Sequence, residues 1–213
     1  MRPHYWQTDT SVSVSSWGYV EGKSDFKSAR ALLHDLLDIV SKNGNLLLNV
    51  GPKGDGTIPA DAAALLEELG AWLRVNGEAV YGTRPWRCYG EGQQKVVQGQ
   101  MTEKRNGGLG AGDVRFTAAK DGRSLYAHLL AWPPRAVATV SALAAHEEVS
   151  EVRLLGHAAP LPFERAPGGA LRVTMPREPP PGVRDAFVLK LALAAPAASP
   201  TFGASPSTKS CLR

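Results

Sequence analysis

The chain has 213 residues, of which 43% are hydrophobic and 21% are charged, and these proportions are typical of a globular protein with one large or two small domains. The formal net charge is +4, but the basic residues are scattered along the chain, which argues against a nucleic-acid-binding function. No stretch reaches the ~20 apolar residues of a membrane span, and no apolar signal-peptide core is present at the amino terminus.

The amino-terminal segment is predicted to contain a strand followed by a helix. Residues 4–14 alternate and are rich in Thr, Ser and Val, which favours a strand, and residues 15–24 read as a loop with exposed aromatic side chains. From Phe26 the apolar residues recur at i, i+3 and i+4, which predicts an amphipathic helix. We expect Asp25 to cap the start of this helix and Asn43-Gly44 to end it.

A second strand and a second helix are predicted next. Residues 45–50, NLLLNV, carry apolar residues without alternation, which indicates a strand buried on both faces, as in a parallel sheet covered by helices. Residues 51–59 are rich in turn-forming residues, and Pro59 suits the first turn of a helix. The apolar stripe of this second helix is formed by Leu65, Leu66, Leu69, Trp72 and Leu73. The order strand, helix, strand, helix predicts an α/β unit in residues 1–86.

The sequence pattern changes after Trp86. Short alternating runs, separated by Gly and Pro, predict strands in the remainder, such as the run of Phe187, Leu189 and Leu191. Residues 87–193 are therefore predicted to form an antiparallel β-sandwich. Residues 194–213 are rich in Ala, Ser and Pro and are predicted to be a disordered tail.

Several motifs that would indicate cofactor or metal chemistry are missing from the sequence. The glycines at 51, 54 and 56 give G-x-x-G-x-G, without the spacing of a dinucleotide-binding loop or the GK[ST] of a phosphate-binding loop. The histidines and the two cysteines, Cys88 and Cys211, have no metal-ligand spacing, although one disulfide between these cysteines remains open. We predict no cofactor and no metal.

Residues 5–19 suit recognition of a neutral sugar. Aromatic rings pack against the CH faces of a sugar ring, and side-chain amides bond to its hydroxyl groups. Trp6, Gln7 and Trp17 supply these groups, and loops at the carboxyl ends of strands form the active sites of α/β barrels. Packing of the two tryptophans in the core is the alternative.

Three segments in this order resemble the end of the catalytic domain of the α-L-fucosidases of glycoside hydrolase family 29: WQTDTSVSVSSWGY, DIVSKNGNLLLNVGPKGDGTIP and WLRVNGEAVYGTRPW. The segment DVRFTAAKDGRSLYAHLLAWP is similar to that family's C-terminal β-sandwich. The resemblance implies the C-terminal portion of a (β/α)8 barrel in residues 1–86, followed by the sandwich. It also implies retaining hydrolysis of terminal α-L-fucose, with fucosylated glycans or glycosides as partners and neither nucleic acid nor membrane.

The resemblance also implies that the chain lacks the catalytic nucleophile. The family's nucleophilic aspartate belongs to an earlier barrel strand, upstream of Met1, so this chain alone is expected to be inactive. Gln7 stands where part of the family has an acid/base glutamate, and an amide cannot deliver a proton. The nearest carboxylate, Asp9, is a weaker candidate for a catalytic role.

We predict four substrate contacts, on the expectation that they end or follow the two strands: Trp6, Gln7, Trp17 and Asn49. Asn49 has an alternative role as a cap of the loop at residues 51–56. Without the other barrel strands, Leu46, Leu47 and Leu48 should be partly exposed to water.

The competing interpretation is a non-catalytic β-sandwich that binds carbohydrate or serves as a structural module. Carbohydrate binding would need an exposed row of aromatic residues, for which only Tyr126 and Trp132 qualify. Members of the fucosidase family are often secreted, periplasmic or lysosomal. The resemblance leaves the compartment of this chain open and allows a homo-oligomer of the full-length protein.

Overall fold

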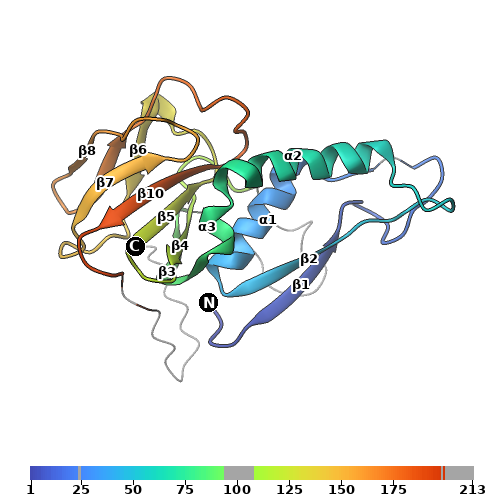
Figure 1. Cartoon of the computed structure of the whole chain (residues 1–213), viewed down its shortest axis with the longest axis horizontal. Helices are drawn as coiled ribbons and strands as arrows, with labels where there is room; N and C mark the ends of the chain where they lie inside the picture. Colours follow the sequence, from blue (N-terminus) through green and yellow to red (C-terminus); the bar gives the residue numbers. More distant parts are fainter. Residues whose placement is uncertain (24, 94–107, 198, 200–213) are drawn as a thin grey trace.

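The computed structural model describes residues 1–23, 25–93, 108–197 and 199. A two-stranded parallel sheet lies on one side of a group of helices, and a β-sandwich lies on the other side (Figure 1). Helix α1 (Ala29–Ser41) contacts strand β2 (Gly44–Asn49) and also the first two strands of the sandwich, so it joins the two parts. The prediction of an α/β unit followed by an all-β unit is confirmed.

Strand β1 (Trp6–Ser11) pairs in parallel with β2, from Trp6 opposite Gly44 to Ser11 opposite Asn49. Side chains alternate across the pair, so that Leu48 packs against the helices while Leu47 on the other face is 52% exposed. Among the described residues β2 pairs with β1 alone. The expectation of burial on both faces is therefore wrong for this chain, and the expected partial exposure of the leucines is confirmed.

Local hydrogen bonds shift both predicted ends of α1. Its N-cap is Ser28, whose Oγ accepts a hydrogen bond from the Ala31 amide at 3.2 Å, and not Asp25. At the other end, Asn43 adopts the left-handed conformation with φ 74°, which asparagine tolerates, and Gly44 already belongs to β2. A side chain at position 44 would meet the Trp6 ring at 2.6 Å, so this strand position requires glycine.

Helix α2 (Ala60–Asn76) contributes to two hydrophobic cores. Pro59 is its N-cap residue, one position before the predicted place. Near its start, Ala62 and Leu65 pack with Leu32 of α1 in a small cluster behind β1 and β2. Near its end, Trp72 belongs to the main core of the sandwich. The short helix α3 (Glu78–Tyr81) then leads into the first strand of the sandwich.

The sandwich consists of a five-stranded and a three-stranded antiparallel sheet. The larger sheet has the order β3-β4-β5-β10-β7, with the bounds Thr83–Glu91, Val114–Ala119, Ser124–Leu129, Phe187–Leu193 and Val149–Leu154. The smaller sheet has the order β6-β9-β8, with the bounds Val137–Val140, Leu171–Thr174 and Phe163–Arg165, and a 3-10 turn, η2 (Pro134–Ala136), precedes β6. The helices contact the face of the larger sheet that is turned away from the smaller one (Figure 1).

Two predicted domain limits differ from the structure. The boundary between residues 86 and 87 falls inside β3, because residues 83–85 already pair with β4. The predicted tail starts at residue 194, but Ala197 is buried and its amide donates to the Gly122 carbonyl at 2.7 Å. Residues 198 and 200–213 of this tail, with Cys211, lie outside the described residues.

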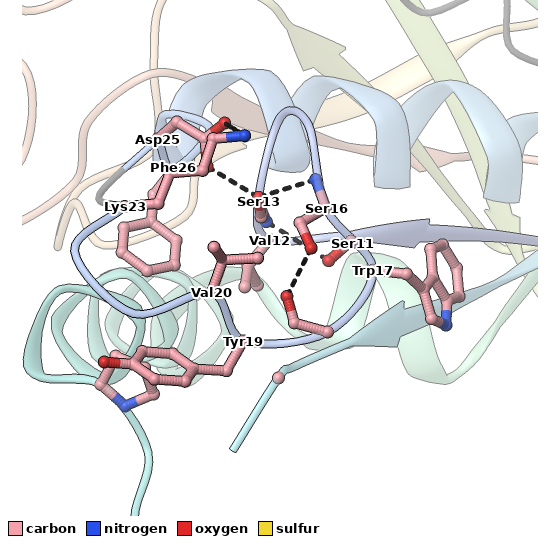
Figure 2. A pocket seen from close by; sticks show the side chains of 13 residues that line it. Ser11, Val12, Ser13, Ser16, Trp17, Tyr19, Val20, Lys23, Asp25 and Phe26 are labelled. Carbon is pink, nitrogen blue, oxygen red and sulfur yellow. Dashed lines mark hydrogen bonds and ion pairs between the residues drawn. The ribbon is translucent and has the colours of Figure 1, made fainter. Parts of the chain in front are cut away.

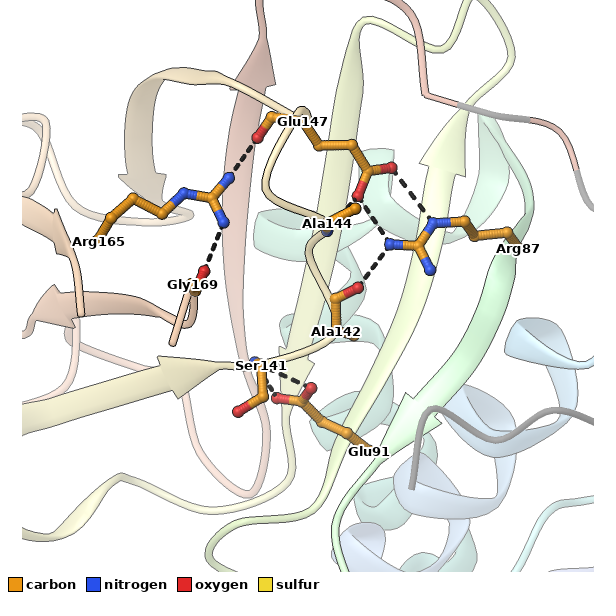
Figure 3. Close-up of polar contacts among 8 residues, drawn as sticks. All are labelled: Arg87, Glu91, Ser141, Ala142, Ala144, Glu147, Arg165 and Gly169. Atoms are coloured by element: carbon orange, nitrogen blue, oxygen red, sulfur yellow. Dashed lines mark hydrogen bonds and ion pairs between the residues drawn. The ribbon is translucent and has the colours of Figure 1, made fainter. Parts of the chain in front are cut away.

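Strand β3 also holds the loop that connects β6 to β7 (Figure 3). Arg87 donates to the Glu147 carboxylate at 2.7 Å and to the Ala142 carbonyl at 2.6 Å. Both carboxylate oxygens of Glu91 accept from the Ser141 amide at 3.0 Å, and burial raises the pKa of Glu91. Strand β3 therefore links the larger sheet to the loop that follows β6 of the smaller sheet.

A buried ionic cluster joins α1 to the sandwich. Asp38 of α1 accepts from Arg115 Nε of β4 and from Lys42 Nζ, each at 2.6 Å, and the Tyr89 ring centroid lies 4.9 Å from Lys42 Nζ. The Asp38 and Arg115 side chains are only 7% and 3% exposed, and burial lowers the pKa of Lys42. Because these side chains are buried, water cannot solvate a charge whose partner is removed. The stability of each charge therefore depends on the other charges of the cluster.

Neutral hydrogen bonds reinforce the same interface. The Trp72 indole donates to the Ala186 carbonyl at 2.8 Å, and His34 Nε2 lies 2.9 Å from the Asp185 carbonyl. The Thr117 hydroxyl of β4 donates to the Ala79 carbonyl of α3 at 2.7 Å. Contacts of this kind occur along α1, α2 and α3, so the helices and the sandwich form one packed unit.

Replacement of Asp38 by alanine should strongly destabilise the protein. It leaves Arg115 and Lys42 buried without their carboxylate, which costs about 3–5 kcal/mol in the free energy of unfolding. Urea unfolding measures this loss. The matched control is Glu151→Ala, which breaks the exposed pair with Arg153 and should change stability far less, because solvent screens that pair. Equal effects of the two variants would contradict the cluster's role.

His128 of β5 is buried in the neutral form. Its Nε2 lies 2.9 Å from the Thr117 oxygen, and the single proton of that hydroxyl is donated to the Ala79 carbonyl. His128 Nε2 therefore carries the donated proton, and Nδ1 is an acceptor without a partner among the described residues. Burial lowers the pKa of His128 to about 3.

Mild acid should therefore reduce stability through His128. Its pKa is about 3 in the folded protein and 6.5 in the reference state, so between these values only the unfolded chain takes up the proton. The free energy of unfolding falls by about 1.4 kcal/mol per pH unit below pH 6.5, which gives about 2 kcal/mol from pH 7 to pH 5. Urea unfolding at both pH values should show that His128→Gln, which keeps the donor, removes this loss. His146→Gln, at an exposed position, should retain it, and an unchanged loss in His128→Gln would contradict the assignment.

Candidate functional site

A small pocket opens where β1 and β2 end (Figure 2). It is lined by Ser11 at the end of β1, by the loop of residues 12–26, and by Gly51 and Pro59 after β2. Ligand sites of parallel α/β sheets form at the carboxyl ends of the strands, where the connecting loops converge. The pocket has this location.

Asp25 organises the loop that surrounds the pocket. Its carboxylate accepts from the Ser13 hydroxyl at 2.8 Å and from the Ser15 hydroxyl, and Lys23 Nζ lies 3.7 Å away. The hydrogen bonds from Ser15 and then Ser13 hold the pKa of Asp25 below its usual value. A general acid needs a raised pKa, so Asp25 is suited to holding the loop in place and not to donating a proton.

Asn49 connects the end of β2 to the same loop. Its Nδ2 donates to the Trp17 carbonyl at 2.5 Å and to Ser11 Oγ at 3.1 Å. The alternative role as a cap of residues 51–56 is wrong, because the Lys53 amide donates to the Thr57 carbonyl in that loop and the Gly56 amide donates to the Lys53 carbonyl, while the Asn49 amide bonds to Trp17 and Ser11. The backbone of Tyr19 lies so close to Gly51 that a Cβ there would meet its nitrogen at 2.6 Å.

The two tryptophans differ in their environment. Trp17 is 53% exposed and its ring extends away from the serines of the pocket, while Tyr19, whose ring lies on the opposite side of the pocket, is 38% exposed (Figure 2). Trp6 is half-buried, donates its indole N–H to the Lys42 carbonyl at 3.1 Å and covers Gly44. Trp6 is thus held by Lys42 and Gly44, outside both hydrophobic cores, and Trp17 is largely exposed.

The predicted site residues fall into two groups. Trp17 and Asn49 come together at the pocket. The expectation that all four end or follow the strands is wrong for Trp6 and Gln7, because β1 begins with them. Four residues at about 3.3 Å each put Gln7 roughly 13 Å from Ser11 along the strand. Gln7 and Asp9 lie on the exposed face turned away from the helices, and the role of Gln7 in substrate binding and that of Asp9 in catalysis stay predictions.

Sequence reasoning missed several residues that build the pocket. Ser11, Ser13 and Asp25 form its polar wall, and the alternation of serine at positions 11, 13 and 15 was the available signal. The N-cap assignment of Asp25 concealed its contacts with serines earlier in the chain. Gly51 was interpreted as a turn residue, whereas it also permits the close approach of Tyr19.

Other kinds of site find little support. Over residues 1–23, 25–93, 108–197 and 199, no three or more His, Cys, Asp or Glu are grouped to hold a metal ion, and no helix is long and apolar enough to cross a bilayer. Tyr126 is 5% exposed beneath Lys190, and Trp132 packs edge-on against Phe187 at 4.8 Å. These two aromatic residues therefore form no exposed row for carbohydrate binding.

Comparison with known proteins gives one consistent family. The family model of α-L-fucosidase matches residues 1–78, and that of the α-L-fucosidase C-terminal domain matches residues 110–192. Human plasma α-L-fucosidase is 33% identical over 177 residues, which are 82% of this chain and 34% of that protein. Rat tissue α-L-fucosidase is 30% identical over 192 residues, which are 88% of this chain and 37% of that protein.

A solved structure agrees in fold. The crystal structure of Thermotoga maritima α-fucosidase matches with a TM-score of 0.71 and 29% identity, over 90% of this chain and 40% of that chain. The chain thus spans between a third and two fifths of the length of these relatives. The two matched regions follow one another in the order of the α/β unit and the sandwich, and the chain belongs to the α-L-fucosidase family of glycoside hydrolases.

Proposed function

We propose that this chain is the C-terminal part of a retaining α-L-fucosidase, in which β1, α1, β2 and α2 close a (β/α)8 barrel. The observation that carries the proposal is the ordered match to both fucosidase regions over residues 1–78 and 110–192. The geometry supports it, because β1 and β2 are parallel, have helices on one face only, and end at a pocket. The substrate class is terminal α-L-fucose on glycans or glycosides.

The reaction needs more than this chain contains. Retaining hydrolysis uses two carboxyl groups about 5–5.5 Å apart, one as nucleophile and one as acid and then base. On the face of β1 that would line the barrel, Gln7 is an amide and Asp9 is the one carboxylate of that strand. We place the nucleophilic aspartate on barrel strands that precede this segment in the family.

The chain's own contribution is the wall of the site at the ends of β1 and β2. The exposed rings of Trp17 and Tyr19 are suited to packing against the CH face of a sugar. Asn49 uses its amide on the Trp17 carbonyl, so it acts by positioning this loop. The rival carbohydrate-binding role of the sandwich loses its basis, because Tyr126 and Trp132 are not exposed together.

The purified chain should not hydrolyse an aryl α-L-fucoside. A fusion in which the part of T. maritima α-fucosidase that precedes the aligned region is joined to this chain should release the aryl alcohol. The expected difference arises because only the fusion has the barrel strands to which we assign the nucleophilic aspartate. Release is followed spectrophotometrically against a mock preparation. Turnover by the chain alone would refute the missing nucleophile, and a folded but inactive fusion would refute the proposed activity.

Replacement of Asn49 by alanine should loosen the loop that carries Trp17. It removes two hydrogen bonds of about 0.5–1.5 kcal/mol each, so the amides of residues 16–20 should exchange with deuterium about tenfold faster or more. Hydrogen exchange with mass spectrometry measures this. Asn45→Ala is the matched control, because Asn45 is an exposed amide of the same strand without a side-chain hydrogen bond in the described part of the chain. Unchanged exchange in Asn49→Ala would show that the loop is held by other contacts.

A further inference from the structure

A second hollow lies beside the pocket at the ends of β1 and β2. It measures about 370 Å³ and is open to solvent, whereas the pocket measures about 20 Å³, which is room for about one water molecule. A sugar is therefore too large for the pocket, while the hollow has the size of a ligand site. The lining of the hollow includes Tyr19, Lys23, Phe26, Lys53, Pro59 and Asp61.

Both walls of the hollow come from the loops that follow β1 and β2 and from the start of α2. Tyr19, Lys23 and Phe26 precede α1, and Lys53 and Pro59 precede α2. Helices α1 and α2 contact each other directly. The shape of the hollow is therefore set by contacts within the described chain and not by strands beside β1 or β2.

Local contacts hold these walls in place. The backbone of Tyr19 packs on Gly51, and the Lys23 amide donates to the Val20 carbonyl at 3.2 Å, which closes the turn after Tyr19. In the other wall Pro59 is buried as the N-cap residue of α2. A ligand therefore meets a preformed surface, which lowers the entropy cost of binding.

The lining combines aromatic rings with charged groups of both signs. Lys23 Nζ lies 3.7 Å from the Asp25 carboxylate, and Asp61 itself lines the hollow, so its charge does not favour an anion. A neutral pyranose suits this lining, because its CH face packs on an aromatic ring such as that of Tyr19 or Phe26. Its hydroxyl groups can accept hydrogen bonds from ammonium groups and donate to carboxylates.

One loop presents two aromatic rings in different directions. The Trp17 ring extends away from the serines of the pocket, and the Tyr19 ring lies on the opposite side, where it lines the hollow (Figure 2). A sugar that packs on Tyr19 is therefore separate from a sugar that packs on Trp17. Two linked sugars can use the two rings together.

We propose that the hollow binds the neutral sugar that carries the fucosyl group, and that this sugar packs on the ring of Tyr19. The Trp17 side is then left for the fucosyl group. The proposal rests on the proposed function for the identity of that group. It narrows the substrate class to fucosylated oligosaccharides, in which a second sugar ring is present to fill the hollow.

The full chain tests the site without catalysis. Methyl β-D-galactoside, a neutral pyranoside, is titrated into the ¹⁵N-labelled chain, and we expect saturable amide shifts at Tyr19, Lys23 and Lys53 with a millimolar dissociation constant. Tyr19→Ala should weaken binding about tenfold, because it removes the ring under the sugar. Tyr81→Ala is the matched control, because Tyr81 is 71% exposed on α3, outside the hollow, and should bind as the unmodified chain does.

A second variant guards against a disturbed loop in Tyr19→Ala. Lys53→Met removes the ammonium group from the opposite wall, keeps the aliphatic part of the side chain, and should also weaken binding. The proposal is overturned by the absence of shifts, by shifts that both variants leave unchanged, or by tighter binding of methyl β-D-glucuronide. The last outcome would assign the hollow to an anionic ligand.

The fusion with the preceding part of T. maritima α-fucosidase gives a separate readout. In the fusion, Tyr19→Ala should lower kcat/KM about tenfold more for a fucosylated disaccharide than for an aryl α-L-fucoside. Equal losses for the two substrates would overturn the assignment to the sugar that carries the fucosyl group. Galactoside binding by the chain together with an inactive fusion would support the sugar site and count against the proposed activity.

Discussion

The carboxylate of Asp38 is the point on which the arrangement of this protein depends. It neutralises one cation from its own helix and one from the sandwich, and all three groups are almost fully buried. Without it, two positive charges would lie together in a medium that solvates neither. Helix α1 also packs on β2. The Asp38 side chain therefore helps to fix the position of the sandwich relative to the strands that end at the pocket.

The pocket is built mainly from main-chain and small polar groups. Serine hydroxyls, the Asn49 amide and the Asp25 carboxylate fix the loop, while glycine at position 51 lets two backbone segments approach closely. The large rings of Trp17 and Tyr19 remain at the surface. Such a construction holds apolar rings at the surface on a frame that is already hydrogen-bonded.

Periodicity in the sequence was sufficient for the elements and for the order of the two units. The stripe of α1, the turn-rich residues 51–59 and the alternating runs of the sandwich all depend on local patterns, which the structure retains. The leucine run at 46–48 reflects a strand covered on both sides, but this chain covers it on one side only. A sequence pattern records the environment of the complete fold, and here it could not indicate which neighbours are present.

What the sequence could not predict depends on long-range contacts. The sequence pattern predicts that Asp25 caps a helix. In the structure its carboxylate instead accepts hydrogen bonds from Ser13 and Ser15. The predicted limit of the sandwich near residue 86 lies inside β3, because the pairing of Thr83, Arg84 and Pro85 with β4 is a contact between distant parts of the chain. Trp6 and Gln7 were placed at the wrong end of β1, since residues 4–14 show no signal for where the pairing begins.

The larger sheet of the sandwich carries Arg115, Thr117 and His128 on the side that meets the helices, all of them buried polar groups with partners or neighbours in that layer. The helices thus supply partners to this side of the sandwich, Asp38 for Arg115 and the Ala79 carbonyl for Thr117. Separation of the sandwich from the helices would replace these protein partners by water.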